Sequence, residues 1–148
     1  TAGKNAVSYT NSTQIPVEFT DDIFKVVELQ DELQSLYTGG TVLHLYLGER
    51  IEDKDVCKAL IKKIFSTSKM PYISITPTFS VCQKHGYITG EHFECPECGE
   101  KTEVWSRVVG YLRPVQDYND SKYDEYMNRK KFVVDEDEIE DVLSDFRN

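Results

Sequence analysis

The sequence lacks two features that mark large classes of protein: a long hydrophobic run and an excess of basic residues. No apolar stretch approaches the roughly 20 residues that a membrane-spanning helix requires, and the first residues lack the basic-then-apolar pattern of a secretory signal. Lys and Arg number 17 against 26 Asp and Glu, and the resulting net charge of -9 argues against a protein that tracks a phosphate backbone. We therefore expect a cytoplasmic protein that binds neither a membrane nor a nucleic acid.

The residues that are present give a globular balance and an uneven distribution of charge. Hydrophobic residues make up 39% and charged residues 29% of the 148 residues, which fits one domain or two small ones. From Val133 onward there are seven acidic residues and one basic residue, so residues 1–132 hold 19 acids and 16 bases and carry a charge of only -3. The acidity therefore lies mainly in a carboxyl-terminal tail.

The hydrophobic periodicity predicts an α/β unit, an irregular segment and two further helices. A helix–strand–helix–strand order is predicted for residues 21–36, 41–47, 53–68 and 72–81, the last of them interrupted at Pro77. Residues 101–118 have no clean helical or strand period but are rich in Val, Trp, Tyr and Leu, so we expect a buried loop. A charged helix is predicted for residues 121–132. A short tail helix is predicted to pack back on the same protein through Ile139, Val142, Leu143 and Phe146.

Two residues with potential ligand atoms stand apart from any cluster. Cys57 lies in the second predicted helix among apolar residues at helical spacing, and we interpret it as a buried, unreactive thiol. His44 lies between apolar neighbours in a predicted strand, and no second ligand is near it in the sequence. We interpret His44 as a packed polar residue rather than a metal ligand.

The other three cysteines fall in two short segments of the same pattern, Cys-x-x-(Cys or His)-Gly. These segments are CQKHG at residues 82–86 and CPECG at residues 95–99, and we call the pair the double knuckle. In each turn two ligands reach one metal, the glycine frees the backbone to curl, and amide N–H groups can stabilise the bound thiolates. Clustered Cys and His without a secretory signal indicate a metal site before a disulfide.

The double knuckle supplies three thiolates and one imidazole, from Cys82, His85, Cys95 and Cys98. This tetrahedral set suits Zn(II) better than iron. His92 competes for the fourth position, but only His85 has the spacing of the turn. Four protein ligands leave no open position, so we interpret the zinc as structural. Residues 82–100 hold too few large apolar side chains for a core, and this segment is predicted to need the metal to fold.

Residues 107–112 (RVVGYL) resemble the glycyl-radical loop of the anaerobic ribonucleoside-triphosphate reductases, whose pattern is Arg-Val-x-Gly-Tyr. The residues in this pattern are Arg107, Val108, Val109, Gly110 and Tyr111. Other segments look like the carboxyl-terminal part of that enzyme in the same order: YTNSTQIPV at 9–17, YTGGTVLHLYL at 37–47, the double knuckle, and GYLRPVQ at 110–116. The resemblance covers about residues 1–132 and leaves the acidic tail outside. The Cys-x-x-His form of the first knuckle departs from the more familiar four-cysteine site.

The resemblance implies that Gly110 carries a glycyl radical. Removing a hydrogen atom from a glycine α-carbon gives a radical flanked by an amide nitrogen donor and a carbonyl acceptor, and the lack of a side chain lets the α-carbon flatten. An apolar surround is expected to keep oxygen and water away, formed by Val108, Val109, Tyr111 and Leu112. The alternative interpretation is a turn glycine that needs a positive φ, the commonest reason for a glycine in a loop.

The resemblance also implies a reaction and partners. A separate radical S-adenosylmethionine activase with a 4Fe-4S cluster removes the hydrogen atom, and the radical passes to a cysteine at the centre of a barrel. The thiyl radical takes the 3′ hydrogen of a ribonucleoside triphosphate, the 2′-hydroxyl leaves as water, and formate or a thiol system is the reductant. The parent oxidoreductase is expected to be a homodimer that makes deoxyribonucleotides for DNA replication.

The chain is too short for a ten-stranded barrel, and its cysteines include no candidate for the thiyl residue. We therefore expect an α+β fragment from the end of the reductase's α/β barrel, inactive alone. The units expected are residues 1–81 as the barrel segment, 82–100 as the zinc-ribbon-like double knuckle, 101–118 as the radical loop and 119–148 as a helical acidic tail.

Two other hypotheses for the function of this chain remain open. One is a freestanding radical domain that replaces a damaged one in a partner barrel. The other is a zinc-ribbon interaction module whose acidic tail contacts a basic partner, and this one gives Gly110 no role. For the tail itself, docking of the activase or another regulatory role is the alternative to packing on its own protein.

Overall fold

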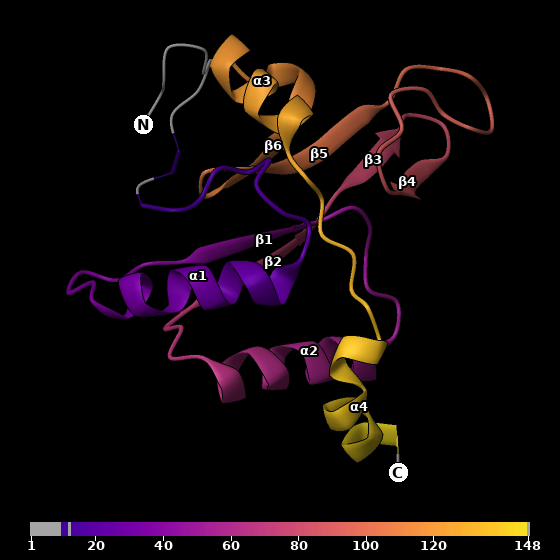
Figure 1. Ribbon diagram of the computed structural model, residues 1–148. Helices are drawn as coiled ribbons and strands as arrows, with labels where there is room; N and C mark the ends of the chain where they lie inside the picture. Colours follow the sequence, from indigo (N-terminus) through magenta and orange to yellow (C-terminus); the bar gives the residue numbers. More distant parts are fainter. Residues whose placement is uncertain (1–9, 12, 148) are drawn as a thin grey trace.

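The computed structural model describes residues 10–11 and 13–147. Its main elements are α1 (Ile23–Ser35), β1 (Leu43–Leu47), α2 (Lys54–Thr67), β2 (Ile73–Pro77), β3 (Phe79–Cys82), β4 (Gly86–Thr89), β5 (Glu103–Val108), β6 (Tyr111–Pro114), α3 (Asp120–Asn128) and α4 (Glu140–Arg147). Figure 1 shows α2 and α4 at one end of the molecule, α3 with β5 and β6 at the other, and β1, β2 and α1 between them. None of the described helices is long and apolar enough to cross a membrane. Tyr9 and Ser12, which belong to one of the resembling segments, lie outside the described residues, as do residues 1–8 of the first expected unit.

The predicted helix–strand–helix–strand order is confirmed. β1 and β2 form a parallel two-stranded sheet that pairs residues 43–47 with 73–77, and α2 makes the crossover between the two strands. Both helices begin at an aspartate cap. The side chains of Asp22 and Asp53 each accept a hydrogen bond from a main-chain N–H of the first turn, at 2.9 and 2.8 Å. These caps satisfy donors that have no partner inside the helix, which is why the helices start where the sequence predicts.

The main core fills the space between the parallel sheet, its helices and the tail. It includes the buried side chains of Ile23, Val26, Val27, Leu43, Leu45, Leu47, Val56, Ala59, Leu60, Ile64, Met70, Phe132, Ile139, Val142 and Leu143. Cys57 lies beside this face of α2 rather than on it and is only half-buried. The prediction of a buried thiol on an apolar face is therefore wrong, because the buried stripe of α2 passes through Val56 and Leu60 and leaves Cys57 at its margin.

The strand predicted for residues 72–81 is two strands in two different sheets. β2 ends at Pro77, and β3 begins at Phe79. The main-chain N–H and the hydroxyl of Thr78 both donate to the carbonyl oxygen of Leu47, each at 3.1 Å. Thr78 therefore closes the parallel sheet, and the chain then pairs with β4 and β5 instead. The interruption predicted at Pro77 marks this change of sheet.

The loop predicted for residues 101–118 is mainly a β-hairpin. β5 and β6 pair in an antiparallel sheet of order β4-β3-β5-β6. The inner face of β5 buries Val104 and Ser106, which are 0% and 1% exposed. A polar residue thus takes one of the buried positions, and the strand lacks the apolar alternation by which a half-buried strand is recognised.

Both helices predicted after the hairpin are present. α3 ends at Asn128, four residues before the predicted end. In the tail a 3-10 turn (Asp137–Ile139) leads into α4, and Ile139 and Leu143 are fully buried against the main core. Two ion pairs join the tail to α2, Lys62 with Asp145 at 2.9 Å and Lys63 with Asp141 at 2.7 Å. The prediction that the tail helix packs back on its own protein is confirmed.

Candidate metal centre and hairpin tip

The four predicted metal ligands converge beside the four-stranded sheet. Cys82 is the last residue of β3, His85 directly precedes β4, and Cys95 and Cys98 lie in the connection from β4 to β5. Their ligand atoms all lie within 4.8 Å of one another. The Sγ atoms of Cys82 and Cys98 are 3.8 Å apart. Two sulfurs on one tetrahedral zinc ion are expected at roughly this separation, about 3.8 Å, so the donor set fits zinc.

The backbone of both turns has the curl that the double knuckle predicts. Gly86 and Gly99 follow the second ligand of each turn, and their φ angles are +75° and +72°. Only glycine adopts this left-handed region without a steric cost. The main-chain N–H of Lys84 points to the Sγ of Cys82 at 3.4 Å. A donor in this position stabilises a thiolate, as the pattern indicates.

His85, and not His92, belongs to the cluster. His85 Nδ1 lies 3.3 Å from the Sγ of Cys95 and 3.9 Å from that of Cys82. His85 Nε2 lies 3.5 Å from the carboxylate of Glu97, an arrangement that leaves Nδ1 as the nitrogen available to a metal. His92 Nε2 instead contacts the carbonyl oxygen of Thr89 at 3.1 Å. The structure thus brings together the set that knuckle spacing selects.

The same contacts bias the protonation of the metal-free cluster. The hydrogen bond with His85 lowers the pKa of the Cys95 thiol to about 6. The hydrogen bond with Cys95 in turn raises the pKa of His85. A thiolate is therefore already favoured at Cys95 near neutral pH, and thiolates are the form of cysteine that binds metal. A closed set of three thiolates and one imidazole suits a structural role, since no position is left for a substrate.

The segment that resembles a radical loop forms the tight turn between β5 and β6. Val108 and Tyr111 are the last paired residues, and Val109 and Gly110 make the turn. Val109 has a φ of +53°, in a region that β-branched residues rarely occupy. Gly110 has no left-handed φ, and a Cβ added to it meets no atom of the described residues within 4 Å. The interpretation of Gly110 as a turn glycine that needs positive φ is therefore wrong.

The side chains around Gly110 are exposed. Val109 is 49%, Tyr111 75% and Leu112 44% exposed, while Val108 is half-buried. The expectation that these side chains bury the glycine is wrong for this chain. The physical reason is that a two-residue turn projects its side chains beyond the end of its own sheet. Another domain or chain is needed to cover them.

The side chain of Arg107 connects the turn to the parallel sheet. Its Nη1 donates to the carbonyl oxygen of Gly110 at 2.8 Å, and its Nε donates to the Oγ1 of Thr76 at 3.0 Å. Thr76 belongs to β2 and is 3% exposed. The guanidinium therefore bridges two sheets that are far apart in sequence.

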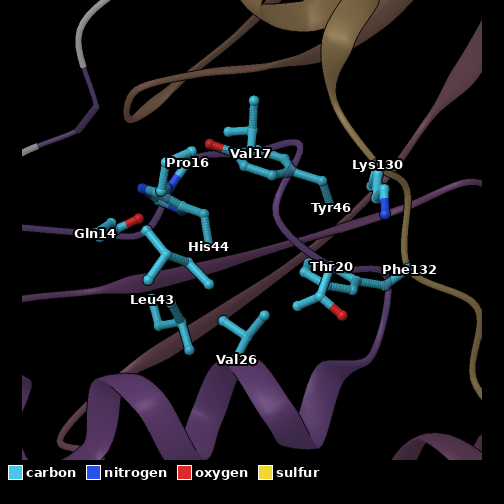
Figure 2. Close-up of a pocket in the computed structure, with 11 residues that line it drawn as sticks. Gln14, Pro16, Val17, Thr20, Val26, Leu43, His44, Tyr46, Lys130 and Phe132 are labelled. Carbon is cyan, nitrogen blue, oxygen red and sulfur yellow. The ribbon is translucent and has the colours of Figure 1, made fainter. Parts of the chain in front are cut away.

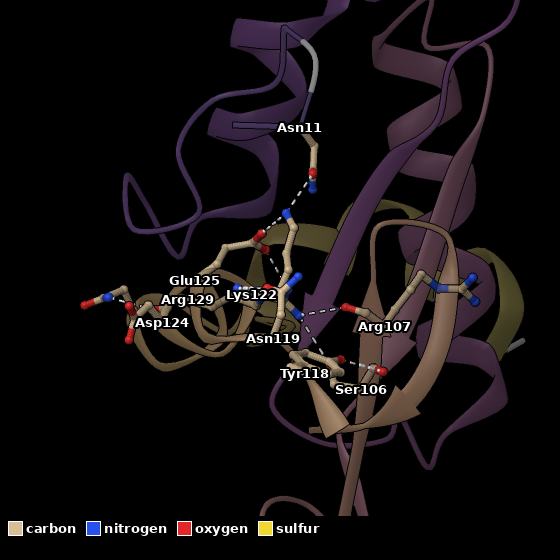
Figure 3. A network of polar contacts seen from close by, with 10 residues as sticks. Asn11, Ser106, Arg107, Tyr118, Asn119, Lys122, Asp124, Glu125 and Arg129 are labelled. Carbon is tan, nitrogen blue, oxygen red and sulfur yellow. Dashed lines mark hydrogen bonds and ion pairs between the residues drawn. The ribbon is translucent and has the colours of Figure 1, made fainter. Parts of the chain in front are cut away.

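A buried ion pair holds the same end of β5 from another side (Figure 3). Arg129 Nη2 and the carboxylate of Glu125 are 2.8 Å apart, with side chains 1% and 4% exposed. Arg129 Nη1 donates to the Ser106 hydroxyl at 3.3 Å and to the carbonyl oxygen of Arg107 at 3.2 Å. The hydroxyl of Tyr118 donates to the carbonyl oxygen of Ser106 at 2.8 Å. The i, i+4 spacing of Glu125 and Arg129 is the one local feature of the sequence that points to this network, which was not predicted.

A cavity of about 30 Å³ lies between residues 14–20 and β1 (Figure 2). His44 and Tyr46 line it, and His44 Nδ1 and the Tyr46 hydroxyl are buried without a hydrogen-bond partner among the described residues. Burial, and then the charges of Arg107 and Arg129, lower the pKa of His44 and favour its neutral form. The volume matches roughly one water molecule and excludes a nucleotide. His44 is a packed polar residue, as predicted, and lies outside the metal cluster.

Comparisons with known proteins identify the family. Residues 2–132 match the family described as "Anaerobic ribonucleoside-triphosphate reductase". A search of curated proteins found no match. A solved structure named "Anaerobic ribonucleotide reductase" is similar at 27% identity with a TM-score of 0.64, covering 82% of this chain and 19% of its own.

Two crystal structures of the anaerobic ribonucleotide reductase from Thermotoga maritima are also similar, each at 27% identity. The one with glycerol in the active site has a TM-score of 0.52 and covers 70% of this chain and 17% of its own. The one with MES in the active site has a TM-score of 0.51 and covers 66% and 16%. The chain thus spans less than a fifth of the length of each of these three solved reductases. It belongs to the anaerobic ribonucleoside-triphosphate reductase family.

Proposed function

We propose that this chain is the radical-bearing carboxyl-terminal portion of an anaerobic ribonucleoside-triphosphate reductase. In this proposal a separate radical S-adenosylmethionine activase removes one hydrogen atom from the α-carbon of Gly110, and a structural zinc ion is held by Cys82, His85, Cys95 and Cys98. The whole enzyme converts a ribonucleoside triphosphate into the deoxyribonucleotide. The chain alone holds neither the barrel nor the thiyl cysteine and is expected to reduce no nucleotide.

The observation that carries the proposal is that nothing in the conformation of Gly110 requires a glycine. The residue that adopts a left-handed φ is Val109, and the space around Gly110 admits a Cβ. The choice of glycine is then explained by chemistry at the α-carbon. A radical there flattens and delocalises over the neighbouring amide nitrogen and carbonyl group, and a side chain opposes both the flattening and the approach of the abstracting partner.

The exposed tip supports the proposed partners. An activase must reach the α-carbon of Gly110, and the turn lies at the end of a hairpin with its apolar side chains uncovered. Val109, Tyr111 and Leu112 offer an apolar surface for the remainder of the reductase. Covering this surface removes apolar area from water and also excludes oxygen and water from the radical.

The proposed zinc site lies near the start of β5, at the opposite end of this strand from the turn that contains Gly110. β3 ends at Cys82, and β5 begins at Glu103, five residues after Cys98. Zinc bound to the double knuckle would join the end of β3 to the connection before β5 and so hold the base of the hairpin. When bound, the ion supplies a crosslink and no reaction with substrate, because its four positions are taken by protein.

The test is anaerobic activation followed by electron paramagnetic resonance spectroscopy. The chain is mixed with a reductively primed radical S-adenosylmethionine activase, and a doublet from a single α-hydrogen is expected. Exposure to air should then cleave the chain at Gly110. Gly110→Ala should abolish the doublet and the cleavage. Gly39→Ala is the matched control, because Gly39 also has no left-handed φ and no neighbour to its added Cβ.

Two outcomes would contradict the proposal. An unchanged doublet in Gly110→Ala places the radical elsewhere. No doublet in the wild-type chain, with an activase that activates a full-length reductase of the family in parallel, favours the zinc-ribbon interaction module instead.

A further inference from the structure

The proposed function leaves Arg107 without a role, although its guanidinium donates a hydrogen bond to the carbonyl oxygen of Gly110. Resting on that function, we infer that Arg107 is a positioning residue for the radical. Its hydrogen bond to the Gly110 carbonyl oxygen stabilises the unpaired electron once the α-hydrogen has gone.

The geometry fixes the guanidinium at two of its nitrogens. Nη1 donates to the Gly110 oxygen at 2.8 Å, a length typical of a charge-assisted hydrogen bond. Nε donates to the Thr76 hydroxyl at 3.0 Å, and Thr76 is almost fully buried in β2. A flexible side chain near the end of β5 is thereby held against a rigid support in the other sheet.

The main chain of Arg107 is held as well. Its carbonyl oxygen accepts a hydrogen bond from Arg129 Nη1, and Arg129 is itself paired with Glu125 inside the protein. Figure 3 shows this contact, with the Arg107 guanidinium extending away from Arg129. Both ends of the residue are therefore fixed, and the donor faces Gly110 before any reaction takes place.

The chemistry explains why a donor at this oxygen matters. Loss of the α-hydrogen breaks one C–H bond homolytically. The hydrogen atom is transferred to the radical that the activase makes from S-adenosylmethionine, and one electron stays on the Gly110 α-carbon. That electron is shared with the adjacent carbonyl, which acts as the acceptor. A cationic donor at the carbonyl oxygen strengthens the acceptor, and because it is already in place no rearrangement is needed. Arg107 gains or loses neither a proton nor an electron.

The test compares radicals in the full chain by high-field electron paramagnetic resonance. The variants are Arg107→Met, Arg107→Lys and Thr76→Val, with Arg113→Met as the matched control because Arg113 is an exposed arginine on the facing strand β6. Arg107→Met should raise the largest g value, because the oxygen lone pairs rise in energy without the hydrogen bond. Its radical should also decay about tenfold faster under anaerobic conditions. The g value and the decay rate of Arg107→Lys should lie between those of Arg107→Met and the wild type. Thr76→Val should shift both quantities in the same direction as Arg107→Met.

A second measurement does not depend on activation. In the resting chain labelled with ¹³C at the Gly110 carbonyl, Arg107→Met and Thr76→Val should move the carbonyl resonance upfield, and Arg113→Met should not. If Arg107→Met acquires no radical, this resonance alone tests whether Arg107 donates a hydrogen bond to the Gly110 carbonyl oxygen. An unmoved resonance, or a wild-type g value and lifetime in Arg107→Met, overturns the inference. The proposed function fails separately, through the spectra of the wild-type chain and Gly110→Ala.

Discussion

The guanidinium of Arg129 lies 3.6 Å from the centroid of the Tyr46 ring, so a cation just after α3 is stacked on an aromatic ring of β1. The same guanidinium is paired with Glu125 and bonded to two oxygen atoms of β5. A single buried charge therefore connects α3 and β1 to β5, which is one strand of the hairpin that carries Gly110.

Removing the partner of this charge should destabilise the fold. Glu125→Ala is expected to lower the free energy of unfolding by about 3 kcal/mol, because Arg129 would remain buried without its counter-charge. The measurement is chemical denaturation followed by circular dichroism. Glu28→Ala, which breaks an exposed pair with Lys25, is the control and should leave the midpoint unchanged. If both substitutions changed the free energy of unfolding equally, the buried pair would contribute no more to stability than the exposed pair.

Substituting alanine for each of three glycines should show whether a glycine is required at that position for its backbone conformation. Gly110→Ala and Gly39→Ala are expected not to lower stability, because neither glycine has a left-handed φ or a neighbour within reach of a Cβ. Gly40→Ala should cost about 1 kcal/mol, because Gly40 has a φ of +87°. Thermal unfolding of the metal-loaded chain measures all three. Strong destabilisation by Gly110→Ala would remove the main support for a chemical role.

Val109 is expected to hold strain in the turn. Val109→Gly should raise the free energy of unfolding by roughly 0.5–1 kcal/mol, because glycine adopts the φ of +53° without the clash of a branched Cβ. Val108→Gly is the opposite control and should lower it by about 1 kcal/mol, because Val108 lies in the paired strand. Denaturant titration gives both values. A loss of stability in Val109→Gly would show that no strain is relieved.

Metal removal should affect one segment. Chelation is expected to raise hydrogen exchange over residues 82–100 while α1 and α2 keep their protection, because these helices belong to a separate core. One zinc ion per chain is expected by mass spectrometry. Zinc affinity should fall as the pH is lowered, because protons compete for the thiolates, first at Cys98, whose pKa is raised, and then at Cys95, whose pKa is about 6. Exchange that rises equally throughout the described chain would contradict a local role.

Two substitutions test how the imidazole is held. Glu97→Gln should weaken zinc binding by about tenfold, because the carboxylate beside His85 Nε2 orients the ring. His92→Ala should leave zinc affinity unchanged, since His92 lies outside the cluster. Competition with a chromophoric chelator measures both affinities, and the reverse order would identify His92 as the ligand.

The tail should contribute through its apolar face rather than its charges. Leu143→Ala is expected to lower the free energy of unfolding by about 3 kcal/mol, because a fully buried side chain is removed from the core. Asp145→Asn breaks the exposed pair with Lys62 and should give no measurable change. Urea denaturation distinguishes them. A larger effect of Asp145→Asn would favour an electrostatic attachment.

Features with local signals were predictable from the sequence. α1 and α2 begin at aspartates that cap their own first turns, and their apolar faces repeat within a few residues. The double knuckle is equally local, because each pair of ligands lies three positions apart and the following glycine sets the curl. The structure brings these four ligands together, while their occupation by zinc stays a prediction.

The hairpin could not be predicted in the same way. β5 buries Ser106 beside Val104, and the serine is satisfied by Arg129 from beyond α3. A pattern of apolar and polar residues cannot anticipate a polar side chain whose partner comes from 23 positions away. The exposure of the turn was missed for a related reason, since apolar composition predicts burial but does not say what covers the surface.

Short stretches of the chain were enough to predict the two capped helices, the spacing of the metal ligands and the family resemblance, because each depends on residues near one another in the sequence. The change of sheet after Pro77 and the partners of the Arg107 guanidinium depend on tertiary packing. Thr78 meets Leu47, and Arg107 meets Thr76, each across 31 positions. Contacts at such separations depend on how the sheets pack, and no local pattern of residues encodes them.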